Sequence, residues 1–203
     1  MGYLEKKRNA MLNSISAEQP PLPSAYQEVE YIQSTGSQYL ITDITPKPTQ
    51  EYYIKASFQS EINQVGFGSR TSGTYSSSTN QVYFNMSGGD YTIYLGSKSN
   101  RLTRPTETGG VVEYDINHTD YLSNCDGTGT RPFYIFALNN LGSAYPGSQM
   151  KIYKLTIKEN GLYVLDLIPC YRKSDNVVGM YDTVSGTFLT NQGRGTFLKG
   201  SDV

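Results

Sequence analysis

Two carboxylates on one expected strand are the residues of this chain best placed for acid–base chemistry. Residues 111–117 alternate apolar and polar side chains, which predicts a β-strand with Glu113 and Asp115 on the same face. Two carboxyl groups about 5 Å apart can cleave a glycosidic bond. Such cleavage also needs a carboxylic acid that donates a proton, but this stretch has no second glutamate for that role, and position 118 is a histidine, His118. We therefore predict a protein that is not an enzyme, and we assign no catalytic residue.

Metal and thiol chemistry have little support in the sequence. His118 is the only histidine, and neither Cys125 nor Cys170 stands at a metal-ligand spacing from another residue. The spacing of the two cysteines leaves a disulfide open, although free and buried thiols are the expected state. No serine is marked as a nucleophile with a base and an orienting acid.

One short segment has the composition of an oxygen-rich calcium loop. Residues 124–129 read Asn-Cys-Asp-Gly-Thr-Gly, but they lack the alternating ligands and the distal glutamate of an EF-hand. Asp126-Gly127 is also a strong hairpin-turn signal, which is the interpretation we favour. Asp126 is thus the single candidate metal ligand, with calcium as its ion, and no other cofactor is expected.

The remaining chemistry is binding through polar loops. Loops are expected over residues 70–80 and 139–148, and both contain tyrosine and asparagine. Tyrosine rings stack on sugar rings, while amides reach the hydroxyl groups. The candidate ligand-binding residues are Tyr75, Asn80, Asn139, Asn140 and Tyr145.

Composition excludes several classes of partner. The 203 residues include 17 basic and 18 acidic side chains, so no overall field attracts nucleic acid. The basic loop 98–107 has no aromatic residue for base stacking. No apolar run approaches the roughly 20 residues of a membrane span, and the N-terminus lacks the apolar core of a secretory signal.

The elements that must hold these residues are strands. Alternating or apolar segments recur every 8–12 residues with turn signals between them, which is typical of a sandwich or jelly roll. Asn160-Gly161 separates two such segments and predicts a two-residue hairpin. The expected strands include 51–59, 63–69, 81–86, 90–95, 111–117 and 132–138.

The first 23 residues differ from the rest. Helical spacing groups four apolar side chains into one stripe, namely Leu4, Met11, Leu12 and Ile15. A helix of about 16 residues needs a partner to be stable in water. Pro20-Pro21-Leu22-Pro23 ends it and forms a stiff spacer. We expect residues 1–23 to be an anchoring or oligomerising segment and residues 24–203 to be one domain.

The two ends of the domain also show a family resemblance. It rests on Tyr26–Tyr39, Lys151–Tyr153, Ile168–Lys173, Gly179–Asp182 and Gly193–Phe197. These segments resemble concanavalin A-like (laminin-G-like) jelly-roll domains of bacteriophage structural proteins from gut bacteria. The resemblance implies an all-β sandwich of two antiparallel sheets, here preceded by the short α-helix and the proline spacer.

The resemblance also implies a setting. It suggests a virion accessory protein, such as a head decoration, a head fibre or a tail-tip subunit, with host or mucosal glycans as candidate ligands. Other capsid or tail proteins would bind residues 1–23, and a homo-oligomer, preferably a trimer, would form. The protein would be made in the host cytoplasm, be released by lysis and lie on the virion surface.

Three alternatives stay open. The first is a free-standing bacterial carbohydrate-binding module, and the second is a purely structural protein that binds no sugar. The third is a glycoside hydrolase, because laminarinase-type enzymes share the fold and place Glu-x-Asp and a further Glu on one strand. Glu113 and Asp115 match only the first two of those positions.

Overall fold

The chain folds into two β-sheets. The computed structural model describes residues 20–59, 64–70, 81–87, 90–95, 110–116, 129–145 and 147–203. Among these residues there is no helix, so the all-β prediction is confirmed for them. The helix expected over residues 1–16 lies outside the described part of the chain. None of the described segments could cross a membrane as an apolar helix.

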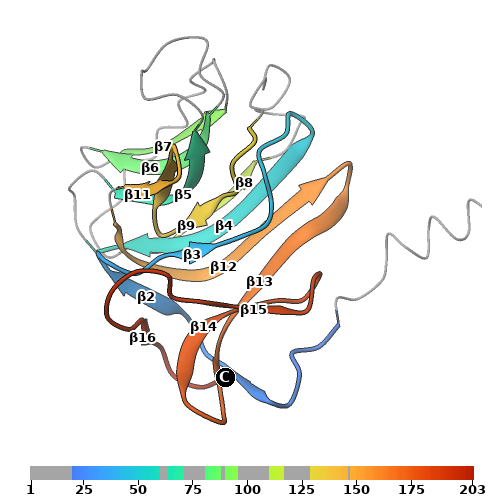
Figure 1. Ribbon diagram of the computed structural model, residues 1–203, viewed down its shortest axis with the longest axis vertical. Helices are drawn as coiled ribbons and strands as arrows, with labels where there is room; N and C mark the ends of the chain where they lie inside the picture. Colours follow the sequence, from blue (N-terminus) through green and yellow to red (C-terminus); the bar gives the residue numbers. More distant parts are fainter. Residues whose placement is uncertain are drawn as a thin grey trace, which may run out of the picture.

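In the described part of the chain, the larger sheet has nine strands and the smaller one has seven; Figure 1 shows their arrangement. The larger sheet consists of β1 (Tyr26–Glu28), β2 (Ile32–Thr35), β4 (Gln50–Phe58), β8 (Val112–Ile116), β12 (Gln149–Glu159), β13 (Leu162–Arg172), β14 (Val177–Asp182), β15 (Thr187–Thr190) and β16 (Leu198–Lys199). The smaller sheet consists of β3 (Leu40–Ile41), β5 (Gln64–Arg70), β6 (Gln81–Ser87), β7 (Asp90–Leu95), β9 (Tyr134–Ile135), β10 (Leu138–Asn140) and β11 (Ser143–Tyr145).

A long hairpin, β12–β13, forms the middle of the larger sheet. Its turn residues Asn160 and Gly161 have φ angles of 52° and 79°, as a type I′ turn requires. The predicted hairpin is therefore confirmed. On its other edge β12 pairs with β4, and β4 in turn pairs with β8.

Far from the turn, the two strands of this hairpin move apart and leave a gap in the sheet, here called the fork. The first strands of the domain fill this fork. β12 and β13 pair with each other only between Leu155 and Leu167. Beyond that point β2 pairs with β12, and β1 pairs with β13. The C-terminal strand β16 then pairs with β2, so the second and the last described strands lie side by side.

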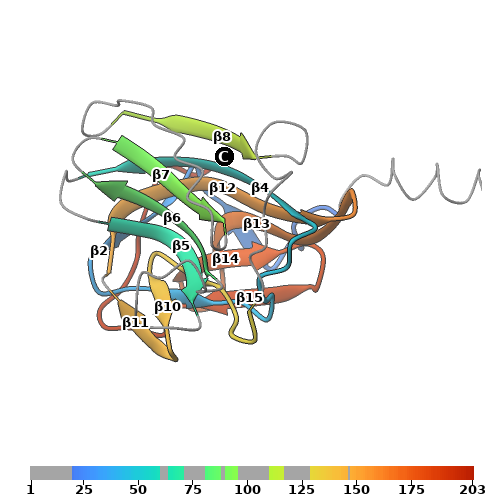
Figure 2. The same cartoon turned by 90° about the horizontal axis from the view of Figure 1, so that it is seen from above.

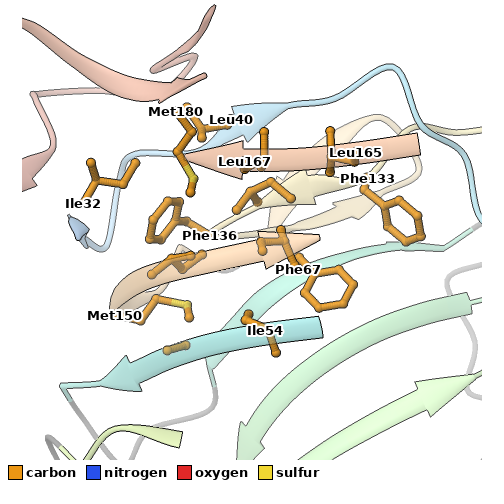
Figure 3. Close-up of a cluster of buried hydrophobic side chains, with 14 of the residues drawn as sticks. Ile32, Leu40, Ile54, Phe67, Phe133, Phe136, Met150, Leu165, Leu167 and Met180 are labelled. Carbon is orange, nitrogen blue, oxygen red and sulfur yellow. The ribbon is translucent and has the colours of Figure 1, made fainter. Parts of the chain in front are cut away.

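The core lies between the two sheets. The alternation of β4 buries Tyr52, Ile54 and Ala56 on one face, opposite Phe67 of β5. Figure 3 shows Ile54 and Phe67 in the same buried cluster as Met150 of β12 and Leu165 and Leu167 of β13. Each fully buried Phe or Ile contributes about 1.5–3 kcal/mol to folding. Seen from above, β5, β6 and β7 lie in front of β4 and β12 (Figure 2).

The structure corrects three expectations. The apolar segment 132–138 is not one strand, because Phe136 adopts a left-handed φ of 66° and divides β9 from β10. The loop expected over 139–148 instead contains β11, which pairs with β10. The smaller sheet is not purely antiparallel, since β10 runs parallel to β5.

Candidate functional site

Polar side chains lie on the outer face of the larger sheet, on four adjacent strands. The register of β8, β4, β12 and β13 aligns Asp115, Tyr53, Thr156 and Asp166 in one row across the sheet. These side chains point outward because their neighbours on β4 and β12, such as Ile54 and Leu155, face the core.

This face is hollowed, with a volume of about 400 Å³. Its lining consists of Glu51, Tyr52, Tyr53, Asp115, Lys154, Thr156, Lys158 and Tyr163. The hollow forms because Thr156 is short and buried between the long side chains of Lys154 and Lys158 on the same strand. Its size lies within the range that holds small ligands.

A short hydrogen bond fixes Tyr53 at the wall of this hollow. The Tyr53 hydroxyl donates to Glu113 Oε1 at 2.6 Å, and Lys55 Nζ lies 3.5 Å from the same oxygen. Partial burial raises the pKa of Tyr53 to about 12, and the bond to Glu113 adds to the rise. The Tyr53 hydroxyl and Lys55 lower the pKa of Glu113.

The two lysines of the hollow are also held in place. Lys154 Nζ forms an ion pair with Asp166 Oδ1, on a carboxylate that is 5% exposed. Lys158 Nζ lies 4.7 Å from the centre of the Tyr163 ring, a cation–π contact. Tyr163 itself is 38% exposed.

This arrangement can hold a hydroxylated ligand. Tyr53 and Tyr163 offer aromatic faces, and Thr156, Asp115 and Glu51 offer oxygen atoms for hydrogen bonds. Glycosidic hydrolysis would also need a protonated carboxyl group. Glu113 does not meet this need at neutral pH, because its pKa is lowered.

The structure places three of the candidate loop residues around the β10–β11 hairpin. Asn139 is 1% exposed, its Nδ2 donates to Pro132 O, and its Oδ1 accepts from Gly142 N, each at 2.8 Å. The amide of Asn139 thus stabilises the hairpin rather than facing solvent. Asn140 Oδ1 accepts from Arg70 Nε at 2.7 Å, and Tyr145 is 59% exposed.

The other two candidate loop residues, Tyr75 and Asn80, lie outside the described residues. The strand ends next to them are described. Arg70 pairs with Gln81 on one side and with Asn140 on the other. Arg70, the last described residue before them, thus lies next to β10, and ligand binding by Tyr75 and Asn80 stays a prediction.

The candidate calcium ligand Asp126, His118 and Cys125 lie outside the described residues, as do the assembly residues Leu4, Met11, Leu12 and Ile15. Within the described ranges, no group of three or more metal-ligating side chains occurs. Cys170 is a free, buried thiol, as expected, and burial raises its pKa to about 12.

No match was found in comparisons with protein-family models, with curated proteins or with solved structures.

The hollow was not predicted from the sequence, because the candidate binding residues were those of the polar loops. The alternation of residues 51–59 does assign Glu51, Tyr53 and Lys55 to one outward face. The pairing of that face with Thr156 and Tyr163, about 100 residues later, has no local signal.

Proposed function

We propose that this chain is an accessory structural protein of a bacteriophage virion that displays a lectin-like domain. The observation that carries the proposal is the hollow on the outer sheet face, where Tyr53 and Tyr163 stand beside carboxylate, hydroxyl and ammonium groups. Aromatic faces with converging polar groups are the usual means of binding a sugar on a rigid sheet.

The arrangement of the family-like segments supports a concanavalin A-like jelly roll. The two ends of the sequence that resemble this family are adjacent in space, since β1 and β2 occupy the fork of β12 and β13. The loop 191–195 also holds the loop 35–39, with Arg194 N donating to Ser37 O at 3.1 Å. Segments far apart in sequence thus build one structural unit.

We propose that residues 1–23 anchor the domain on a capsid or tail and make it a homo-oligomer, with a trimer preferred. Single saccharide sites of this depth are weak, often about mM, so several copies would raise the avidity. The protein would lie on the virion surface after synthesis in the host cytoplasm and release by lysis.

A glycan array tests the binding proposal. The full chain should bind a defined set of glycans, and Tyr53→Ala and Tyr163→Ala should each reduce the signal at least about tenfold. Tyr145→Ala is the matched control, because it removes an exposed tyrosine from the β10–β11 hairpin. Loss of binding with Tyr145→Ala alone would move the site to that hairpin, and a blank array would favour a purely structural role.

Solution mass and particle composition test the assembly proposal. By light scattering, the full chain should be an oligomer and a variant beginning at Ser24 a monomer. The protein should also be present in purified phage particles. A monomeric full chain that binds glycans and is absent from particles would indicate a free-standing bacterial carbohydrate-binding module.

One observation favours a second function, glycoside hydrolysis. Asp115 lines the hollow, and Glu113 lies two residues before it on the same face of β8. If the protein hydrolysed a glycan, Glu113→Gln should abolish the activity; hydrolysis that survives the substitution would exclude this pair.

A further inference from the structure

The charges around the hollow are not balanced. Around the hollow, four acidic side chains (Glu51, Glu113, Asp115 and Asp166) and three basic ones (Lys55, Lys154 and Lys158) face outward, and two ion pairs use part of them. Lys55 pairs with Glu113, and Lys154 pairs with Asp166.

The third lysine does not neutralise the remaining carboxylates. Lys158 lies opposite Glu51 in the register, but its ammonium group is over the Tyr163 ring and forms no ion pair within 4 Å among the described residues. Glu51 and Asp115 therefore face the hollow without a cationic partner in the described part of the chain.

Tyr53 adjoins both carboxylates, which are themselves at diagonal positions on adjacent strands. Asp115 is directly opposite Tyr53 on β8, and Glu51 is two residues before it on β4. Residues at such diagonal positions have their Cβ atoms about 7–8 Å apart. The Tyr53 hydroxyl is turned to Glu113, which lies on the side of Asp115 away from Glu51, so the ring is directed away from the space between Glu51 and Asp115 and leaves that space open.

A hollow lined by two carboxylates and an aromatic side chain attracts an ammonium group through ionic hydrogen bonds and through the ring quadrupole. Lys158, two strands away from Asp115, stands about 10 Å across the sheet and suits an oxygen atom of the same ligand. We propose that the hollow binds a saccharide that carries a free amino group, placed between Glu51 and Asp115 and beside Tyr53. This inference rests on the proposed saccharide-binding function and adds the charge of the ligand.

Two tetrasaccharides with the same backbone test the inference. Isothermal titration calorimetry on the full chain would compare a glucosamine tetramer with an N-acetylglucosamine tetramer. We expect the amino form to bind about tenfold more tightly, as the loss of one well-placed ammonium contact would predict. This comparison uses the unchanged protein and so does not depend on how a variant folds.

The double variant Glu51→Gln/Asp115→Asn then locates the effect. It should reduce the preference for the amino form to less than about threefold. The matched control, Glu28→Gln/Asp43→Asn, removes the same two charges from exposed positions away from the hollow and should leave the preference unchanged.

The other outcomes overturn the inference. Equal binding of the two tetramers, or tighter binding of the acetylated one, would show that the amine is not recognised. A preference that persists in Glu51→Gln/Asp115→Asn would reflect general attraction to the protein. If neither tetramer binds, but the array shows glycans whose binding is lost in Tyr53→Ala, only this inference fails. If neither tetramer binds and the array is also blank, the proposed glycan-binding function fails too.

Discussion

At the scale of single residues, Tyr53 gives the sharpest prediction. Its pKa is raised from 10.0 to about 12, first by burial and then by Glu113. In the wild type, the Cζ carbon of Tyr53 in ¹³C NMR should titrate about two pH units above an exposed tyrosine. Glu113→Gln should lower this pKa while leaving it above 10, because burial remains. A Tyr53 that titrates near 10 in the wild type would contradict the hydrogen-bonded geometry.

The raised pKa of Tyr53 also determines how the stability of the fold changes with pH in alkaline solution. A tyrosine with a raised pKa in the fold contributes stability that is complete below its unfolded pKa of about 10. That contribution is lost as the pH rises toward 12. Unfolding measured between pH 10 and 12 should therefore show a smaller loss of stability for Tyr53→Phe than for the wild type.

Asp182 has a purely structural role. It is 2% exposed, and its Oδ1 accepts from the backbone N–H groups of Asp166 and Val184 at 2.9 and 3.2 Å. Its Oδ2 accepts from Ser185 N and Ser185 Oγ. Asp182→Asn keeps the volume but turns an amide group toward these donors, so the free energy of unfolding should fall by about 2 kcal/mol.

Chemical denaturation with guanidinium chloride measures this loss. Asp175→Asn is the control, because Asp175 is an exposed carboxylate that pairs with Arg172 on the surface. The control should change the unfolding midpoint much less than Asp182→Asn. Equal shifts would mean that the turn between β14 and β15 does not depend on Asp182.

At the scale of elements, local patterns predicted most strands, and their failures have physical causes. Residues 90–95 and the Asn160-Gly161 turn were predicted correctly because alternation and turn chemistry are local. The break at Phe136 was not predicted, because its backbone is held by a distant strand: Phe136 N donates to Gly66 O at 2.6 Å. Tertiary contacts override the local preference there.

The candidate site was less predictable than the strands. Tyr145 is exposed as expected, whereas the sequence gives no sign that Asn139 would be used inside its own hairpin. The hollow depends on a register in which β4 lies between β8 and β12. That order of strands joins residues separated by more than 40 positions, which no alternating pattern specifies.

The loop after β15 contains a glycine that permits a close approach of two backbones. A Cβ atom at Gly193 would lie 1.9 Å from Ser37 O. Gly193→Ala should therefore push apart the loops 191–195 and 35–39 and lower the free energy of unfolding by about 2–3 kcal/mol. Thermal unfolding measures this loss of stability.

Arg194→Ala is the control for this substitution. Arg194 is the next residue, and its side chain is exposed. The Arg194→Ala variant should have a melting temperature within about 1–2 °C of the wild type, since substitutions of exposed side chains usually change stability little. A similarly stable Gly193→Ala variant would show that the two loops can separate without cost.

At the scale of the whole molecule, the two ends of the domain form one seam (Figure 1). Glu30 N donates to Ser201 O at 3.0 Å, and Val203 N donates to Glu28 O at 3.1 Å. Deleting residues 201–203 removes both bonds, so the free energy of unfolding should fall by about 1–3 kcal/mol. Val203→Ala keeps the backbone bonds and is the control for the denaturation measurement.

The position of β12 has a consequence for synthesis. Met150 of β12 pairs with Phe58 of β4, so β4 leaves the ribosome about 90 residues before its neighbour. At 5–20 residues per second this interval lasts on the order of 5–20 s. During that time β4 has β8 as its strand partner but lacks β12, and its apolar side, with Tyr52, Ile54 and Ala56, lacks the β12–β13 part of the core. The nascent chain therefore exposes part of its future core until the second half of the domain has been made.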